Sequence, residues 1–285
     1  MVHLHARCGH HSLVPGLWQP NPHHRLFVGP RPVHNAGMPF HDHFSAQAGA
    51  YARFRPAYPE ALFTWLAQQA RARQLAWDCA TGNGQAALSL TAHFAQVVAS
   101  DASPEQLIRS QAHPQIRYLV AEAESPPAEA QGADLVTVAQ ALHWFDFERF
   151  YPALQHTLKP DGLFAAWGYG LMRITPAVDS VVQEYYSNII GSYWPPERHH
   201  IETGYREIPF PLSELVSPSF VMQAEWSLEI LLGYLETWSA TRLYRQACAG
   251  ADPVESLRVR FVRAWGEVPT RAVTWPVFVR AGRFP

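Results

Sequence analysis

The chain has 285 residues, of which 48% are apolar and 16% are charged, and its net charge is −2. This length allows one large buried core or two small ones, and the near-neutral charge argues against an extended nucleic-acid surface or an acidic-membrane footprint. Three widely spaced cysteines do not suggest a disulfide framework, and no apolar run reaches the length of a membrane span. We therefore expect a cytoplasmic protein whose partner is neither nucleic acid nor a membrane.

The first 39 residues differ in composition from the rest of the chain. They are rich in Pro, His and Gly, as in "WQPNPHHRLFVGPRPVHNAG", and we expect a disordered extension over 1–39 before a folded domain over 40–285. The histidines of "HLHARCGHH" could suggest a metal site. Because no regular element would hold them in a tetrahedral array, we expect no bound metal.

Residues 58–169 alternate between helical and strand patterns. A helix is predicted from Pro59, with others over 85–94, 103–111 and 146–158, and the apolar runs predict strands over 75–79, 96–101, 116–121, 133–140 and 163–169, with a turn over 158–162. This alternation is typical of an α/β fold with a doubly wound, mostly parallel sheet and helices on both faces. The ligand site of such a sheet lies at the carboxyl ends of its strands.

Capping residues sharpen some of these boundaries. Ser103, followed by Pro104 and by Gln106, is typical of a helix start, and Asp146 is the expected cap of the helix that follows it. Pro152 lies within that last segment, and it predicts either a kink or a later start.

Beyond residue 170 the pattern becomes helical and aromatic. We expect an inserted helical cap at about 171–215, a long helical region over 228–247 and a helix from Asp252, whose capping box Glu255 would complete. The alternation of "AVTWPVFVR" predicts a closing strand, and Pro276 indicates that the strand lies near an edge or a bulge.

Two glycines separate a buried strand from a helix in "LAWDCATGNGQAALSL". Gly82 and Gly84, with Ala87, form an acceptable dinucleotide fingerprint, and Asp101 ends the next strand, where a carboxylate can accept bonds from ribose hydroxyls. Asp78 precedes the glycines and would repel a pyrophosphate but attract an ammonium or sulfonium group. Asp78 could instead cap the turn.

Several motifs occur together in an order that resembles a known family. They are "WDCATGNGQAA", "VVASDASPEQL", "VAEAES", "QALHWFD" and "LKPDGLFAAW", and they resemble those of class I S-adenosylmethionine-dependent methyltransferases. The upstream "FSAQAGAYARFRPAYPEAL" is similar to the leading segment of a small-molecule branch that includes trans-aconitate methyltransferase-like proteins. The resemblance spans about residues 40–283. It implies a Rossmann-like, seven-stranded sheet, S-adenosylmethionine as cofactor and a small-molecule acceptor.

The resemblance also implies roles for individual residues. Asp78, Gly82 and Gly84 would hold the methionine part of the cofactor, Asp101 the ribose, Glu122 the adenine amine and Gln140 the region near the methyl group, with Tyr51 and Arg55 over the cofactor. Two positions depart from the family pattern. Ala80 stands where a glycine is usual, and Glu122 where an aspartate is usual.

His143 in "ALHWFD" is the candidate general base, because it follows a strand on the ligand side of the sheet. It could instead pack beneath the site and hydrogen-bond the turn. A carboxylate acceptor would need no base, whereas a hydroxyl or amine would benefit from one. Two other functions remain open at this point: an NAD(P)-dependent oxidoreductase, which would share the glycine turn, and a non-catalytic cofactor-binding protein.

Overall fold

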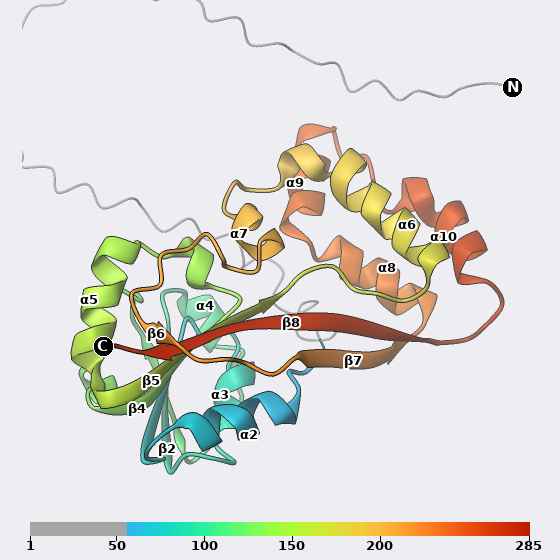
Figure 1. Cartoon of the computed structure of the whole chain (residues 1–285). Coiled ribbons are helices and arrows are strands. Elements are labelled where there is room, and N and C mark those ends of the chain that lie inside the picture. Colours follow the sequence, from blue (N-terminus) through green and yellow to red (C-terminus); the bar gives the residue numbers. More distant parts are fainter. Residues whose placement is uncertain (1–55) are drawn as a thin grey trace, which may run out of the picture. The chain divides into compact units, whose positions relative to one another are not determined.

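The structure, a computed structural model, describes residues 56–285. The predictions for 1–39, for Tyr51 and for Arg55 therefore lie outside the described residues. One mixed sheet forms the centre, with strand order β3-β2-β1-β4-β5-β8-β6, and β7 also pairs with β8 (Figure 1). The order runs outward from β1 in both directions, which is the doubly wound arrangement that the alternating pattern predicts.

Strands β1 to β5 and β8 overlap the segments that the sequence pattern predicts, whereas β6 and β7 were not predicted. The strands are β1 (Leu75–Cys79), β2 (Gln96–Asp101), β3 (Ile116–Val120), β4 (Ala133–Ala139), β5 (Leu158–Tyr169), β6 (Ser213–Glu214), β7 (Phe220–Trp226) and β8 (Arg271–Arg283). Strands β1 to β5 are parallel, and β8 is antiparallel to β5. The sheet has eight strands in this part of the chain rather than the expected seven, because β6 and β7 pair with two separate stretches of β8.

The helices cover both faces of the sheet and then form a separate group. They are α2 (Glu60–Gln69), α3 (Gln85–Leu90), α4 (Pro104–Leu107), α5 (Phe147–Thr157), α6 (Pro176–Glu184), α7 (Arg198–Glu202), α8 (Leu228–Glu236), α9 (Ser239–Ala247) and α10 (Arg258–Trp265), with a short 3-10 turn η3 (Leu142–Trp144) after β4. None of the helices in the described range is both long and apolar enough to cross a bilayer.

Alternate residues of each strand enter two different cores, because successive side chains of a strand point to opposite faces. Ala76 packs in the core covered by α2 and α3, whereas its neighbour Trp77 packs in the core covered by α5. Both side chains are fully buried. The inner parallel strands β1, β2, β4 and β5 are thus largely buried on both faces, which explains why they read as apolar runs, whereas the edge strand β3 is only partly buried.

Two predicted caps are made. The Ser103 hydroxyl accepts from the backbone N–H of Gln106, and the Asp146 carboxylate accepts from two N–H groups at the start of α5. Helix α5 therefore begins where Asp146 predicts, and Pro152 lies inside it rather than delaying its start. The predicted turn over 158–162 is instead part of β5, where Asp161 takes a left-handed φ of 63° and the register with β4 shifts.

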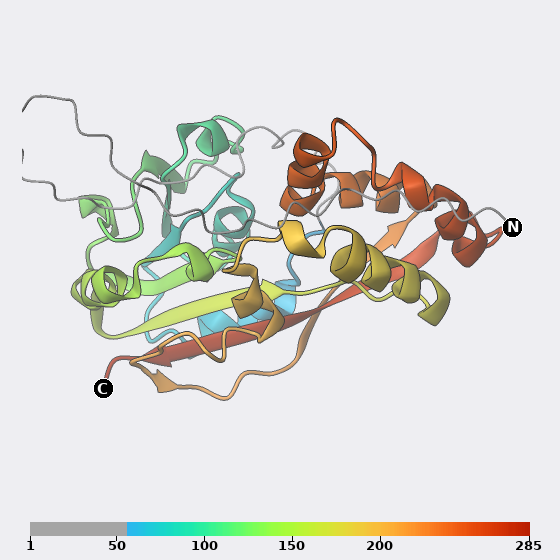
Figure 2. The same ribbon diagram turned by 90° about the horizontal axis from the view of Figure 1, so that it is seen from above.

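Helices α6, α8, α9 and α10 gather beyond the carboxyl ends of the parallel strands (Figures 1 and 2). We call them the helical cap. It extends the predicted insertion at about 171–215, because residues 228–265 also belong to it and α10 packs against α6. The expected long helical region divides into α8 and α9 next to Trp238, whose side chain is buried among other aromatic rings.

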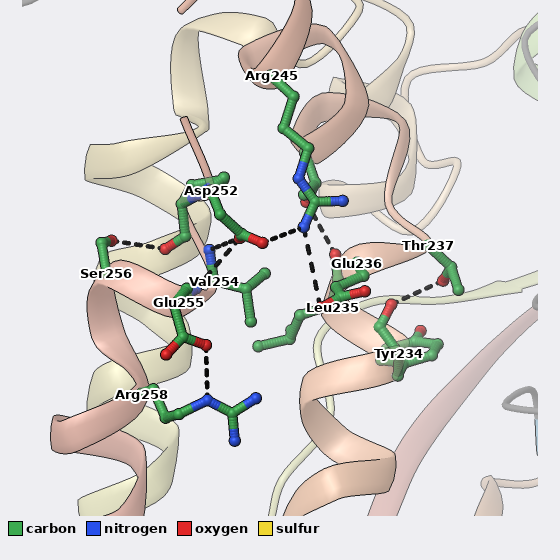
Figure 3. Close-up of polar contacts among 12 residues, drawn as sticks. Tyr234, Leu235, Glu236, Thr237, Arg245, Asp252, Val254, Glu255, Ser256 and Arg258 are labelled. Atoms are coloured by element: carbon green, nitrogen blue, oxygen red, sulfur yellow. Dashed lines mark hydrogen bonds and ion pairs between the residues drawn. The ribbon is translucent and has the colours of Figure 1, made fainter. Parts of the chain in front are cut away.

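The capping box at Asp252 is only half formed (Figure 3). The Asp252 carboxylate accepts from the N–H groups of Val254 and Glu255 at 2.9 and 3.1 Å and also pairs with Arg245 at 2.7 Å. The Glu255 carboxylate turns instead to Arg258, at 2.6 Å. A 3-10 turn (Glu255–Leu257) precedes α10, which begins at Arg258 rather than directly after Asp252.

Closing strand β8 explains the place of Pro276. Its ladder with β5 ends at the pair of Val277 with Tyr169, so Pro276 lies just past the last residue that β5 bonds. The proline is exposed and remains opposite Val221 of β7. Pro276 has no backbone N–H to donate, and it lies where β8 is no longer paired with β5, so that side of β8 is an edge.

Candidate functional site

The corner between β1 and α3 has an unusual backbone. Ala80, Gly82 and Gly84 all have positive φ, at 54°, 58° and 83°. The Thr81 N–H donates to the carbonyl of Ser100 in β2 at 2.9 Å, which ties the corner to the neighbouring strand. Ala80 shows that the position where the family usually has glycine keeps the left-handed conformation without one, at a cost of about 1 kcal/mol.

The two glycines of this corner face different surroundings. A Cβ atom on Gly84 would lie 2.5 Å from the Tyr118 hydroxyl, so a side chain there would displace the Tyr118 ring. A Cβ atom on Gly82 would meet no atom of the described residues within 4 Å. With respect to the described residues, the backbone at Gly82 is therefore open, whereas that at Gly84 is covered by the Tyr118 side chain.

Asp101, at the end of β2, joins the two loops that border this opening. Its carboxylate accepts from the N–H of Gly82 at 2.8 Å and from the N–H of Ser103 at 2.9 Å. The side chain is half-buried. A carboxylate offers about four acceptor sites, so these two bonds do not by themselves exhaust it.

Asp78 lies beneath the corner rather than on its surface. The side chain is fully buried, and its oxygens accept from the hydroxyls of Thr81 and Thr137, the latter at 2.8 Å. Burial raises the pKa of this carboxyl to about 6, against the opposing effect of the two hydroxyls. Asp78 therefore organises the turn, and it would act on a bound cation through space. The direct contact with the methionine part stays a prediction.

Thr137 was missed by reasoning from the sequence. It lies in β4, 59 residues after Asp78, and is fully buried. The available signal was a lone hydroxyl within the apolar run "ADLVTVA". A polar side chain in a strand buried on both faces needs a partner, but the pattern does not say which one.

Glu122 and Gln140 occupy the ends of the two strands that flank β1 and β2. Glu122 follows β3 and is exposed. Gln140 follows β4 with a left-handed φ of 57°, and its side-chain amide donates to the carbonyl of Tyr169 at 3.0 Å. The adenine contact of Glu122 and the position of Gln140 near the methyl group both stay predictions.

His143 is buried in η3, directly after β4. Its Nδ1 lies 3.0 Å from the hydroxyl of Tyr205, a residue that the sequence motifs did not indicate. Burial lowers the imidazole pKa to about 3, and the charges of Arg198 and His200 act in the same direction. The ring is therefore neutral at physiological pH and a poor proton acceptor.

The first described residues border the glycine corner. The Pro56 carbonyl accepts from the side-chain amide of Gln85 at 2.9 Å, and Gln85 is the first residue of α3. Tyr58 packs edge-on against Trp167 of β5, with ring centroids 5.6 Å apart. The chain thus enters the described structure beside the candidate site.

A cavity of about 1420 Å³ lies between the cap helix α6, helix α7 and β8. Its lining combines apolar side chains, such as Ile201 and Phe278, with polar ones, such as Arg198. A Cβ atom on Gly168 would lie 2.4 Å from the Phe278 ring and 3.1 Å from the Gln140 side-chain oxygen. Phe278 of the cavity wall and the Gln140 side chain therefore both lie next to Gly168, near the carboxyl end of β5.

The doubly wound sheet and its acid-and-glycine corner define a nucleoside-binding class of α/β protein. A family model described as "Methyltransferase domain" matches residues 77–166. A solved structure from Anaeromyxobacter dehalogenans, provisionally named a type II methyltransferase, is 44% identical with a TM-score of 0.75, covering 81% of this chain and 99% of that one. The chain belongs to the class I S-adenosylmethionine-dependent methyltransferases.

Curated relatives agree with this assignment. A Dictyostelium discoideum protein, also provisionally named a methyltransferase, is 29% identical over 248 residues, which are 84% of this chain and 94% of that protein. An uncharacterised methyltransferase of Mycobacterium tuberculosis strain H37Rv is 38% identical over 120 residues, or 42% of this chain and about half (49%) of the relative. The protein is thus an S-adenosylmethionine-dependent methyltransferase, and the oxidoreductase alternative is not favoured.

Proposed function

We propose that the corner after β1 binds S-adenosylmethionine, with the methionine part over Gly82 and the ribose hydroxyls on Asp101. The open backbone at Gly82 and the half-buried carboxylate of Asp101 suit an adenosine-bearing ligand. Asp78 lies under the same turn and, when ionised, favours a cationic ligand. These residues fit the family's cofactor, and the open face of Gly82 is the observation that carries this proposal.

The remaining predicted contacts complete this proposed site. Glu122 would lie near the adenine amine and Gln140 near the transferable methyl group. Tyr51 and Arg55 would cover the cofactor, and the position of Pro56 beside Gln85 is consistent with this arrangement. The bound cofactor supplies an electrophilic methyl group, and the chain's task is to hold the acceptor in line with it, an effect worth roughly 7–11 kcal/mol in well-oriented pairs.

We further propose that the acceptor is a small molecule that enters the cavity between α6, α7 and β8 and accepts the methyl group on an oxygen. The mixed apolar and polar lining suits an acceptor of modest size. Among oxygen acceptors, a carboxylate is favoured over a hydroxyl, since the neutral, weakly basic His143 would remove a hydroxyl proton poorly. The base role of His143 stays a prediction, and His143→Ala with unchanged turnover would remove it.

Isothermal titration calorimetry tests the cofactor proposal. S-adenosylhomocysteine should bind and NADH should not. Binding of NADH alone would overturn the proposal. Mass spectrometry of a metabolite extract incubated with isotope-labelled cofactor would then identify the acceptor by its added label.

A further inference from the structure

A buried hydrogen bond connects the end of β4 with the segment that follows α7. It joins Nδ1 of His143 to the hydroxyl of Tyr205 at 3.0 Å, between residues 62 positions apart in the chain. Tyr205 is fully buried and His143 keeps only 8% of its surface exposed. Which of the two groups donates in this buried bond decides which ring nitrogen of His143 carries the proton.

The chemistry of the two groups indicates which atom is the donor. The phenol O–H is a stronger acid than the N–H of a neutral imidazole, so the hydroxyl is the better donor of the pair and the unprotonated imidazole nitrogen the better acceptor. Nδ1 is then an acceptor, and the proton of the neutral imidazole lies on Nε2.

Independent contacts hold Tyr205 in place. Its φ of 61° is left-handed, which is uncommon for a bulky residue and persists only where the surroundings impose it. Its N–H donates to the carbonyl of His200 at 2.8 Å, and its carbonyl accepts from Arg280 at 2.9 Å. The ring packs edge-on against Phe278, with centroids 5.0 Å apart. The hydroxyl is thus directed at His143 by the fold rather than by His143 itself.

We infer that Tyr205 is a positioning residue that holds neutral His143 as its Nε2–H tautomer, which makes His143 a hydrogen-bond donor to the methyl acceptor rather than a base. The inference rests on the proposed function, because it assigns the acceptor side of the site to the carboxyl end of β4. Tyr205 bonds the ring at Nδ1 and not at the edge that carries Nε2. A fixed N–H at that edge orients an acceptor oxygen without taking a proton from it.

The tautomer can be read directly from the unmodified protein. Two-bond ¹H–¹⁵N correlation spectra of the full chain, labelled with ¹⁵N-histidine at pH 7.5, separate protonated from unprotonated ring nitrogens. The His143→Gln variant assigns the signal by its disappearance. We expect Nε2 protonated and Nδ1 unprotonated, and a His143 signal with the proton on Nδ1 would overturn the inference.

Methyl transfer from labelled cofactor to a metabolite extract tests the consequence for function. His143→Gln keeps an N–H donor but cannot act as a base, so it should retain transfer within about tenfold, whereas His143→Phe should lose roughly 100-fold. Equal loss in the two variants would contradict the donor role.

A matched pair of tyrosine variants separates positioning from stability. Tyr205→Phe removes the hydroxyl that faces His143. Tyr151→Phe removes a buried hydroxyl that donates to the Pro209 carbonyl and so fastens the same segment without touching His143. We expect transfer to fall about tenfold in the first variant and to be unchanged in the second. Equal rates would refute the positioning role.

Titration with S-adenosylhomocysteine distinguishes the two levels of failure. If the wild type and Tyr205→Phe bind it equally while the tautomer or transfer result is contrary, the positioning inference alone fails. If the wild type does not bind it, the proposed cofactor site fails.

Discussion

The glycine corner and the helical cap use charged and polar residues in opposite ways. At the corner, Asp78 and Asp101 are buried or half-buried and bond the backbone and hydroxyls around three left-handed residues. In the cap, Arg245 and Arg258 form ion pairs, some of them drawn in Figure 3, between partly or largely exposed side chains. Buried polar networks are costly to break, whereas surface pairs contribute little. Substitutions at the corner should therefore have much larger effects than those in the cap.

The largest effect is expected at Asp101. Asp101→Ala removes the predicted ribose acceptor and leaves the N–H of Gly82 without its carboxylate. The affinity for S-adenosylhomocysteine should fall about 100-fold or more, since bonds to charged groups contribute about 1.5–3 kcal/mol each. Calorimetric titration measures this. The control is Asp161→Ala, which removes an exposed partner of Arg71 and should leave the affinity unchanged; equal losses would contradict the assignment.

Asp78 should make stability depend on pH in a defined direction. Burial raises its pKa to about 6 from an ordinary value near 3.8, so the folded state prefers the protonated form. Its contribution is complete below pH 4 and is lost as the pH rises through 6. Asp78→Asn, which stays neutral, should therefore gain stability relative to the wild type by about 1–2 kcal/mol between pH 5 and pH 8. Urea denaturation at the two pH values measures the difference, and a change of opposite sign would refute the raised pKa of the Asp78 carboxyl.

Alanine substitutions at Gly82 and Gly84 should separate an effect on cofactor binding from an effect on stability. Gly82→Ala and Gly84→Ala both place a side chain on a left-handed backbone, at about 1 kcal/mol each. Gly84→Ala adds a clash with Tyr118, so it should lower the melting temperature more. Gly82→Ala should weaken S-adenosylhomocysteine binding more, because its Cβ atom enters the open face. Thermal melts and calorimetry on both variants check this, and the reverse order would show that the ligand does not approach Gly82.

The smallest effects are expected in the cap. Arg245→Met removes ion pairs at 2.7 and 3.8 Å from a partly exposed site and should cost less than about 1 kcal/mol. Asp252→Ala also removes the N-cap hydrogen bonds to Val254 and Glu255, and it should lower the free energy of unfolding by about 1–2 kcal/mol. Neither should alter cofactor affinity. Urea denaturation gives the two costs, and a larger loss from Arg245→Met would mean that the cap depends on its ion pairs.

Local patterns predicted the parallel sheet well, because each buried strand is a continuous apolar run. The caps at Ser103 and Asp146 were equally readable, since a cap involves only neighbouring residues. Pairs of residues that lie far apart in the chain could not be predicted in this way. Neither the partner of Asp78, Thr137, nor the partner of His143, Tyr205, can be identified from local sequence, because the partners are brought together only by the fold.

The same limit applies to the cap. Its helical character follows from the sequence pattern, but the division of 228–247 into α8 and α9 does not; it falls at Trp238, which packs against Tyr185 and Tyr234. Likewise, Glu255 had the right spacing for a capping box but bonds Arg258 instead. Tertiary contacts and nearby charges decided these details, and sequence spacing alone could not.

A crystal structure of the protein with S-adenosylhomocysteine would test the cofactor site most directly. The ribose hydroxyls should lie within hydrogen-bonding distance of the Asp101 carboxylate, with the homocysteine part against the bare backbone of Gly82. Adenosine density elsewhere, or an Asp101 side chain that takes no part in holding it, would contradict the account.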